Sequence, residues 1–253
     1  MVSELRKEVI LETLGKKGVL YTSDIMKKCN VSEITIRRDL IDLESKGLLV
    51  RTHGGAIKSK TLEYQLFSYD LKINKNRQHK ELICKLAAGY IRDHDIVFID
   101  CGTTLSFLTQ FIVHMNLTVI TNSLPVVSDL ISVSNIRLSL IGGEIASERQ
   151  AIYGPLAERS IDYYHVNKAF IGADGISLQN GLSSYDEKEA AITRKMMENA
   201  DEVFLLCDSS KIEKNSYVRF APLSKVHHLI TDKGMSGESV SLYKGAAVDV
   251  IAG

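Results

Sequence analysis

An α/β fold in two parts is predicted by three features of this 253-residue chain. Short helical patterns and then a glycine-containing hairpin fill the first 57 residues, which is the order of a winged helix-turn-helix. From residue 79 onward, helical stretches alternate with short apolar strands, which is typical of a mainly parallel sheet covered on both faces. Residues 58–78 between them are polar and charged. We therefore predict a head at 1–57, a partly helical linker at 58–78 and an α/β domain at 79–253.

The composition is that of an ordinary globular protein, with 45% apolar and 25% charged residues, enough to bury a sizeable core. Lys+Arg and Asp+Glu both number 31, so the formal charge is zero. The first 60 residues hold 12 basic and 8 acidic residues, and the remainder holds 19 and 23. A basic head on an acidic body favours nucleic-acid binding by the head alone.

The cysteines at 29, 84, 101 and 207 form no CxxC pair, which favours reduced thiols over disulfides or a zinc site. The seven histidines add no metal signature, so we expect neither a metal nor a cofactor. Charged residues occupy the N-terminus, where a signal peptide would be apolar, and no uninterrupted apolar span follows. We predict a cytoplasmic protein without a membrane partner.

The first helix is expected over residues 3–16, with Ser3 as its cap and with Gly15 and Gly18 ending it. Apolar residues recur there at helical spacing with charges between them, namely Leu5, Val9, Ile10 and Leu14. A second and a third helix are expected to start at the caps Thr22 and Ser32. Three helices in this order form the frame of the head.

The third helix carries the most informative pattern. Ile36, Leu40 and Leu43 fall at i, i+4 and i+7, so they form one apolar stripe that faces the first two helices. Gly47 ends the helix, 48–52 reads as a strand, and 53–56 (HGGA) offers a tight return. We interpret this hairpin as the wing.

Hydroxyls and arginines on one helix face suit DNA, because phosphate oxygens position a helix while base edges are read in the major groove. A bare Arg-Arg pair is more often an ordinary solvated surface. The agreement of spacing, caps, stripe and hairpin favours DNA binding, although His53 can equally be a plain turn residue. The expected DNA-binding residues are Ser32, Glu33, Thr35, Arg37, Arg38, Arg51 and His53.

Strands are expected at 95–100, 117–121, 137–141, 168–172, 203–207 and 228–231, and helices at 79–92, 104–114, 124–132 and 184–199. In parallel sheets the ligand lies beyond the carboxyl ends of the strands. The junction 100–104 (DCGTT) places backbone N–H groups and two hydroxyls at a helix start, which suits a phosphate. Such a junction alone is more often a capped turn, but polar or glycine-rich loops follow the next two strands as well.

Carboxylates and hydroxyls at further strand ends suit a polyol, and Lys211 suits an anion. Glu187 and Glu189 can equally begin a helix, where negative charge is favourable. The expected effector-binding residues are Asp100, Gly102, Thr103, Thr104, Thr121, Asn122, Ser123, Gly142, Gly143, Asp174, Glu187, Asp208 and Lys211.

From about residue 3 to about residue 250, the chain resembles a DeoR-family transcriptional regulator. The most specific segments are 31–40 (VSEITIRRDL) and 47–56 (GLLVRTHGGA), and the blocks at 100–104, 121–123, 142–143, 171–175 and 208–211 resemble the family's sensor domain. The resemblance implies a repressor of sugar-catabolic genes that binds a double-stranded DNA operator and a phosphorylated sugar. A homo-oligomer, dimer or tetramer, is expected because one short recognition helix makes too few base contacts.

The family's sensor domain is similar in fold to ribose-5-phosphate isomerase and glucosamine-6-phosphate deaminase, so an enzyme of that kind with an accessory head is the alternative. Such isomerases carry an Asp-Gly-Ala-Asp-Glu block, whereas this chain has IGADG at 171–175 and lacks both flanking acids. Their loss removes groups that general acid–base chemistry needs. We expect no catalytic residue and no enzymatic activity. A third possibility is a DNA-binding protein whose body serves only assembly.

Overall fold

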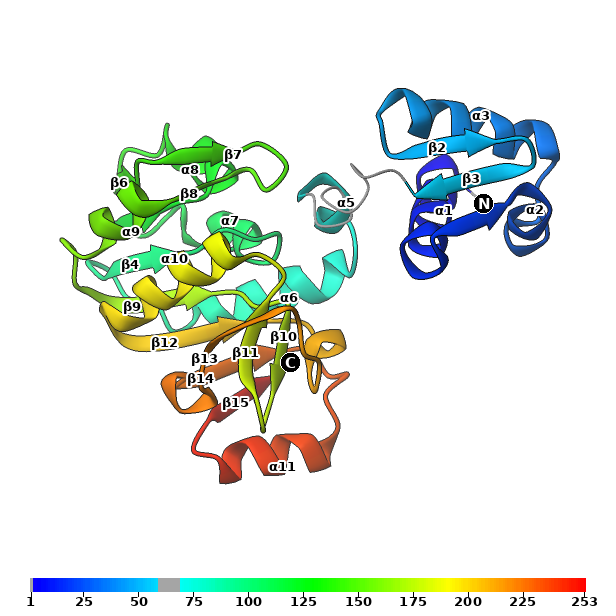
Figure 1. Ribbon diagram of the computed structural model, residues 1–253. Coiled ribbons are helices and arrows are strands. Elements are labelled where there is room, and N and C mark those ends of the chain that lie inside the picture. The colour runs from blue at the N-terminus through cyan, green and yellow to red at the C-terminus, as the bar shows by residue number, and fades with distance from the viewer. Residues whose placement is uncertain (1, 59–68) are drawn as a thin grey trace. The chain divides into compact units, whose positions relative to one another are not determined.

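The computed structural model describes residues 2–58 and 69–253, which form two compact units, Met1–Asn74 and Lys75–Gly253 (Figure 1). Residues 59–68 of the expected linker lie outside the described residues. The rest of that segment contains a short helix, α5 (Tyr69–Ile73), and the first residues of α6. Within the described ranges, no helix has the length and apolar character that crossing a membrane requires.

The N-terminal unit has the element order of a winged helix-turn-helix, as the sequence predicts. Its elements are α1 (Ser3–Lys17), β1 (Val19–Tyr21), α2 (Thr22–Cys29), α3 (Glu33–Ser45), β2 (Leu49–Thr52) and β3 (Gly55–Lys58). The strands form an antiparallel sheet in the order β1-β3-β2. We did not predict β1, because three residues are too few to show an alternating pattern.

The expected ends of α1 were wrong in two places. The helix continues through Gly15 and ends at Gly18, whose φ of +72° is a conformation that glycine adopts without strain. Ser3 lies inside the helix, because Val2 takes the N-cap position. The Ser3 hydroxyl instead donates to Asp39 Oδ1 at 3.4 Å.

The expected caps of α2 and α3 also differ. Thr22 is the first residue of α2, since Tyr21 at the end of β1 holds the N-cap position. Ser32 is the N-cap residue of α3, but its side chain does not cap the helix. Its hydroxyl lies 2.9 Å from Thr35 Oγ1 on the surface.

The apolar stripe of α3 faces inward as predicted. Ile36, Leu40 and Leu43 are at most 2% exposed and pack with residues of α1 and α2, such as Leu14 and Ile25. Full burial of an aliphatic side chain contributes roughly 1.5–3 kcal/mol. The stripe therefore fixes which side of α3 points outward.

The C-terminal unit is built on seven parallel strands in the order β15-β14-β12-β9-β4-β5-β6, which confirms the predicted α/β class. The strands are β4 (Ile96–Ile99), β5 (Leu117–Thr121), β6 (Ile136–Leu140), β9 (Val166–Ile171), β12 (Ala200–Leu206), β14 (His228–Thr231) and β15 (Asp249–Ala252). Six of them were predicted and β15 was not.

Helices cover both faces of this sheet. They are α6 (Arg77–Ala88), a 3-10 turn (Leu105–Leu108) leading into α7 (Thr109–Ile112), α8 (Leu124–Leu130), α9 (Pro155–Ile161), α10 (Glu187–Glu198) and α11 (Gly237–Gly245). Val203 and Leu205 pack in one core with Ile192 of α10, which lies in front of the sheet in Figure 1. Phe204 points to the other face, where it contacts Tyr90, just beyond α6.

Short antiparallel strands lie at the carboxyl edge of the sheet. We did not predict them from the sequence. They are the hairpin β7 (Glu144–Ala146) with β8 (Ala151–Tyr153), and a sheet of β10 (Gly175–Ser177), β11 (Gly181–Ser184) and β13 (Val218–Ala221). Because β11 occupies 181–184, α10 begins at Glu187 and not at 184. Asp186 caps it by accepting from the N–H groups of Lys188 and Glu189.

Candidate functional site

The outer face of α3 carries the charged residues that were expected to contact DNA. Arg37 is 68% exposed and pairs with Glu33 one turn earlier, at 2.7 Å. Arg38 is exposed, and no ion pair of its side chain occurs among the described residues. Ser32 is exposed and Thr35 is half-buried beside it. These side chains form one solvent-facing surface of hydroxyl and guanidinium groups.

Two ion pairs on the opposite side tie α3 to α1, and sequence reasoning missed both. Arg6 donates to the carboxylate of Asp39, with Nη2 3.0 Å from Oδ1, and both side chains are buried. Lys7, the next residue of α1, pairs with Asp42, which lies three residues beyond Asp39 on α3; Lys7 Nζ is 2.7 Å from Asp42 Oδ2. Together with the apolar stripe, these pairs set the rotation of α3 about its own axis.

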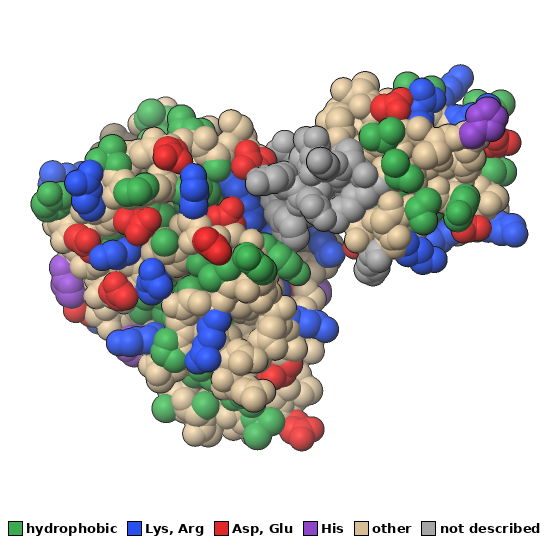
Figure 2. Space-filling view, in the orientation of Figure 1, with side chains coloured by type: hydrophobic (Ala, Val, Ile, Leu, Met, Phe, Trp, Pro, Cys, Tyr) green, Lys and Arg blue, Asp and Glu red, His purple; other side chains and the backbone are tan. Residues whose placement is uncertain are grey.

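The wing places Arg51 and His53 at the surface. Arg51 lies on β2 and pairs with Glu44 of α3, with Nε 2.5 Å from Oε2. His53 is exposed in the turn between β2 and β3. The face of the unit shown in Figure 2 has Lys and Arg side chains at several separate places, so the positive charge of the head is not gathered in one patch there.

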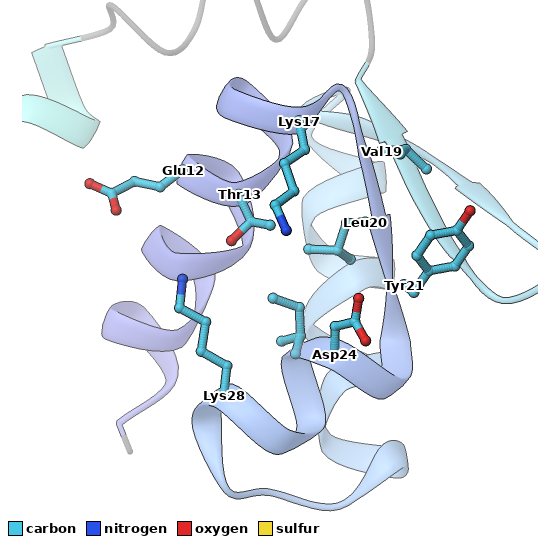
Figure 3. A pocket seen from close by; sticks show the side chains of 9 residues that line it. Glu12, Thr13, Lys17, Val19, Leu20, Tyr21, Asp24 and Lys28 are labelled. Carbon is cyan, nitrogen blue, oxygen red and sulfur yellow. The ribbon is translucent and has the colours of Figure 1, made fainter.

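A pocket of about 250 Å³ lies in the N-terminal unit away from α3. Its described lining comes from α1, β1 and α2, and Figure 3 shows the Lys17 and Lys28 side chains directed into the space between the two helices. Glu12 and Asp24 also line it, so its charges are balanced. This pocket lies apart from the surface that carries Arg37 and Arg38.

In the C-terminal unit, most of the expected effector residues lie at or beyond the carboxyl ends of parallel strands, whereas Glu187 begins α10 after the antiparallel strand β11. Asp100 follows β4 and is fully buried, and its carboxylate accepts from the Cys101 N–H at 2.7 Å and from Thr193 Oγ1 at 2.8 Å. Burial raises the pKa of Asp100 to about 6, although these hydrogen bonds oppose the rise. Asp100 therefore supports the loop from below.

The loop after Asp100 is the more open part. Gly102 has a φ of +134°, and a Cβ there would meet only one atom, at 3.9 Å, so the backbone is accessible. Thr103 Oγ1 accepts from the amine of Lys80 at 2.9 Å. Lys80 lies on α6, is 4% exposed, and was not among the predicted residues. A buried ammonium beside a hydroxyl and an open backbone is suited to an anion such as phosphate.

The loops after β5 and β6 are less open than expected. Thr121, Asn122 and Ser123 are buried, and their side chains bond mainly within the fold, for example Thr121 Oγ1 to the Ile99 carbonyl at 2.6 Å. A Cβ on Gly143 would lie 2.6 Å from the Tyr153 carbonyl, so this glycine permits close packing of β8. Gly142 is exposed, and a Cβ at that position would meet no described atom within 4 Å.

The loops after β9, β12 and β14 are joined to one another and to the start of α6. Lys211 Nζ donates to the Ala173 carbonyl at 2.7 Å, next to Asp174. Asn76 Nδ2 donates to Asp208 Oδ1 at 3.1 Å. Asp232, after β14, accepts from Ser209 N at 2.8 Å. The structure thus brings Asp174, Asp208 and Lys211 to the same edge as Thr103.

Of the two glutamates at the start of α10, Glu187 is exposed and Glu189 points inward. Glu189 Oε2 lies 3.0 Å from Nη2 of Arg149, and their side chains are 18% and 12% exposed. Arg149 comes from the β7–β8 hairpin and was not predicted. Tyr153 on β8 lies beside this pair, with its hydroxyl 3.1 Å from Cys101 Sγ.

Two protein-family models match this chain. Residues 75–233 match the DeoR C terminal sensor domain, and residues 6–61 match the DeoR-like helix-turn-helix domain. The chain belongs to the DeoR family. It is a transcriptional regulator that combines the family's DNA-binding head with its sensor domain, as the sequence resemblance indicates.

Curated members of the DeoR family match along nearly the whole chain. An uncharacterized HTH-type transcriptional regulator of Bacillus subtilis, YulB, is 34% identical over 98% of this chain and 95% of its own length. An L-fucose operon activator of Haemophilus influenzae is 32% identical over 91% and 92%. A lactose phosphotransferase system repressor of Staphylococcus epidermidis is 34% identical over 90% and 91%.

Among solved structures, the DeoR sensor domain is similar to ribose 5-phosphate isomerase A from Methanocaldococcus jannaschii, with 19% identity, a TM-score of 0.41 and 55% of each chain covered. It is also similar to eIF2B delta from Chaetomium thermophilum, with 16% identity, a TM-score of 0.43 and coverage of 64% and 58%.

Proposed function

We propose that this regulator represses genes of carbohydrate catabolism and that a phosphorylated sugar, bound at the carboxyl edge of the seven-stranded sheet, releases it from its operator. The observation that carries the proposal is α3, which buries its apolar stripe and leaves hydroxyls and guanidiniums outward. Two relatives are named as a lactose phosphotransferase system repressor and a putative aga operon transcriptional repressor. Their names support a link to carbohydrate genes and support repression over activation.

On DNA, the outer face of α3 enters the major groove. Arg38 reads a base edge, and Arg37 and Arg51 contact phosphates, because a guanidinium has the fork geometry that both acceptors need. Ser32 and Thr35 supply hydroxyl contacts, and Glu33 orients Arg37 by its ion pair. Pairs of heads in a homo-oligomer multiply these few contacts into specific binding.

At the sensor edge, the phosphate is held by the open backbone at Gly102, the hydroxyls of Thr103 and Thr104, and the amine of Lys80. Asp174 and Asp208 are close enough to this edge to accept hydrogen bonds from sugar hydroxyls. Asp100 and the buried loop 121–123 support the site from beneath. Because the fold carries the DNA-binding head and no flanking acids around Asp174, we propose sensing and not turnover.

DNA binding is tested with a labelled fragment carrying the promoter of the chain's own gene. Arg38→Ala is expected to weaken binding by about 1–3 kcal/mol if Arg38 reads a base. Arg194→Ala, an exposed arginine on α10, is the matched control and is expected to leave binding unchanged. Equal affinity of wild type and Arg38→Ala in a fluorescence anisotropy titration removes Arg38 from the interface.

Sensing is tested by adding pentose and hexose phosphates to the same complex. Release of the DNA by one of them, together with its loss in Lys80→Met, is the expected result. Tighter DNA binding in the presence of the sugar phosphate would contradict relief of repression. Measurable conversion of any of these sugar phosphates by the protein would contradict the non-enzymatic assignment.

A further inference from the structure

Glu189 extends beyond the sheet at its ligand-binding edge. It shares one face of α10 with Thr193, four residues later, whose hydroxyl bonds to Asp100 directly after β4. α10 runs from the carboxyl edge down to the start of β12 at Ala200, so its first turn lies at the upper end. Glu189 therefore lies about one helical turn nearer the carboxyl edge than Thr193.

Arg149 reaches Glu189 from a different element. It comes from the β7–β8 hairpin, and its Nη2 lies 3.0 Å from Glu189 Oε2. A second pair, Lys188 with Glu144 at 2.8 Å, holds the same hairpin to the same helix turn on the outside. A mostly buried ion pair adds little net stability compared with apolar residues of equal size, so anchoring the hairpin does not by itself explain the Arg149–Glu189 pair.

The charges around Arg149 are mostly negative. Arg149 interacts electrostatically with both Glu189 and Asp174, and Asp100 lies beneath them. The Arg149 guanidinium thus interacts with two carboxylates, those of Glu189 and Asp174. A second anionic group on a ligand would be repelled from this end of the edge, whereas neutral hydroxyls, which both donate and accept, fit the mixture of a guanidinium and carboxylates.

We propose that Arg149 and Glu189 contact the hydroxyls of the effector and restrict it to one class: a sugar or polyol with a single phosphate and no second anion. This inference rests on the proposed sugar-phosphate function. The phosphate is held near Lys80 and Thr103, and the neutral hydroxylated end lies against the Arg149–Glu189 pair. Sugar acids and bisphosphates are excluded by charge.

The test is calorimetric titration of the full-length protein with inorganic phosphate and a panel of pentose and hexose monophosphates. The panel includes glucose 6-phosphate with its sugar-acid counterpart 6-phosphogluconate, and fructose 6-phosphate with fructose 1,6-bisphosphate. Wild type is expected to bind a neutral monophosphate more tightly than inorganic phosphate and more tightly than either counterpart.

Two substitutions separate the roles. Arg149→Gln is expected to weaken binding of the neutral monophosphate about tenfold while inorganic phosphate binds as before, because only the hydroxyl contacts are lost. Glu189→Gln leaves the Arg149 charge uncompensated, and is expected to shift the preference about tenfold toward the sugar acid or bisphosphate. Glu189→Asp keeps the charge and is expected to retain the wild-type preference.

Arg159→Gln and Glu198→Gln change exposed residues of α9 and α10 and serve as matched controls. Thermal unfolding identifies any variant that fails to fold. If Glu189→Gln is such a variant, the binding of monophosphate and inorganic phosphate to Arg149→Gln decides the test. An unchanged ratio between monophosphate and sugar acid in Glu189→Gln overturns the inference, as does equal loss of phosphate and sugar phosphate in Arg149→Gln. A wild type that binds bisphosphates best overturns the inference alone, whereas one that binds no sugar phosphate overturns the proposed function.

Discussion

Arg6 of α1 and Asp39 of α3 are joined by two hydrogen bonds inside the N-terminal unit, and the two side chains are 9% and 5% exposed. Asp39 directly follows Arg38 in the sequence, so a buried carboxylate and an exposed guanidinium are neighbours on α3, about 100° apart around the helix. The orientation of the outer side of α3 is therefore coupled to a charge pair on its inner side.

Asp39→Ala is expected to destabilise the N-terminal unit by about 2 kcal/mol, because it leaves the Arg6 guanidinium buried without its carboxylate. Chemical denaturation followed by circular dichroism measures this change. Asp42→Ala removes a half-exposed carboxylate from the same helix and is expected to cost clearly less. Equal losses in the two variants would show that burial of the Arg6–Asp39 pair has no special weight.

Arg51→Ala is expected to lower DNA affinity about equally for all sequences. If Arg51 contacts a phosphate, the slope of log affinity against log salt concentration falls by about one. Glu44→Gln, which removes the carboxylate beside Arg51, is expected to raise affinity, because a negative charge near the phosphate is lost. Anisotropy titrations at several salt concentrations measure both effects. A slope that is the same in wild type and Arg51→Ala argues against the phosphate contact.

The contribution of Asp100 to the stability of the C-terminal unit is expected to fall as the pH rises from about 4 to about 6. Burial raises the pKa of Asp100 from 3.8 to about 6, so in this window the unfolded chain has lost a proton that the native state still holds. The native state then binds more protons, and unfolding becomes easier with rising pH. Above this window the effect of Asp100 is constant.

The measurement is the unfolding free energy of wild type minus that of Asp100→Asn across this pH range. The difference isolates Asp100 from the other carboxylates, and it is expected to decrease between pH 4 and pH 6. A difference that stays flat would contradict a raised pKa at this position.

The four cysteines are expected to resist thiol reagents in the native protein. All four are buried and free, and burial raises the pKa of Cys207 to about 12 and that of Cys101 well above its usual range. The reactive thiolates of Cys101 and Cys207 are therefore scarce, and burial makes all four sulfurs inaccessible to the reagent. A colorimetric thiol assay is expected to detect no fast-reacting thiol in the folded chain and four in denaturant. Rapid native labelling of Cys101 would contradict the buried contact with Tyr153.

The sequence predicts well the elements whose pattern is long or whose ends carry specific residues. The stripe of Ile36, Leu40 and Leu43 spans two turns, so its inward direction follows from helical period alone. The six predicted parallel strands contain short apolar runs, such as IVFI in β4 and VFLL in β12. By contrast, β1, β7 and β8 have three residues each, and such lengths carry no readable period.

The candidate site shows the same division. Residues in the loops that follow parallel strands, such as Thr103 and Asp208, are predictable because a parallel sheet brings all carboxyl ends to one edge. The burial of Lys80 could have been predicted from the sequence, because Lys80 shares a helix face with the apolar residues Ile83, Cys84 and Ala87. The role of Arg149 could not be predicted from the sequence, because its partner Glu189 is forty residues away and lies on a helix, whereas Arg149 lies in a hairpin. Which of Glu187 and Glu189 turns inward depends on where α10 begins, and the neighbouring strand decides that.

Asn76 anchors the first residues of the C-terminal unit by a side-chain hydrogen bond. It lies two residues beyond the boundary between the units, adopts a left-handed conformation with φ of 54°, and bonds to Asp208. The polypeptide thus enters the C-terminal unit at the carboxyl edge of the sheet, beside the loop after β12. A single side-chain amide therefore ties the entry of this unit to a loop 132 residues further along the chain.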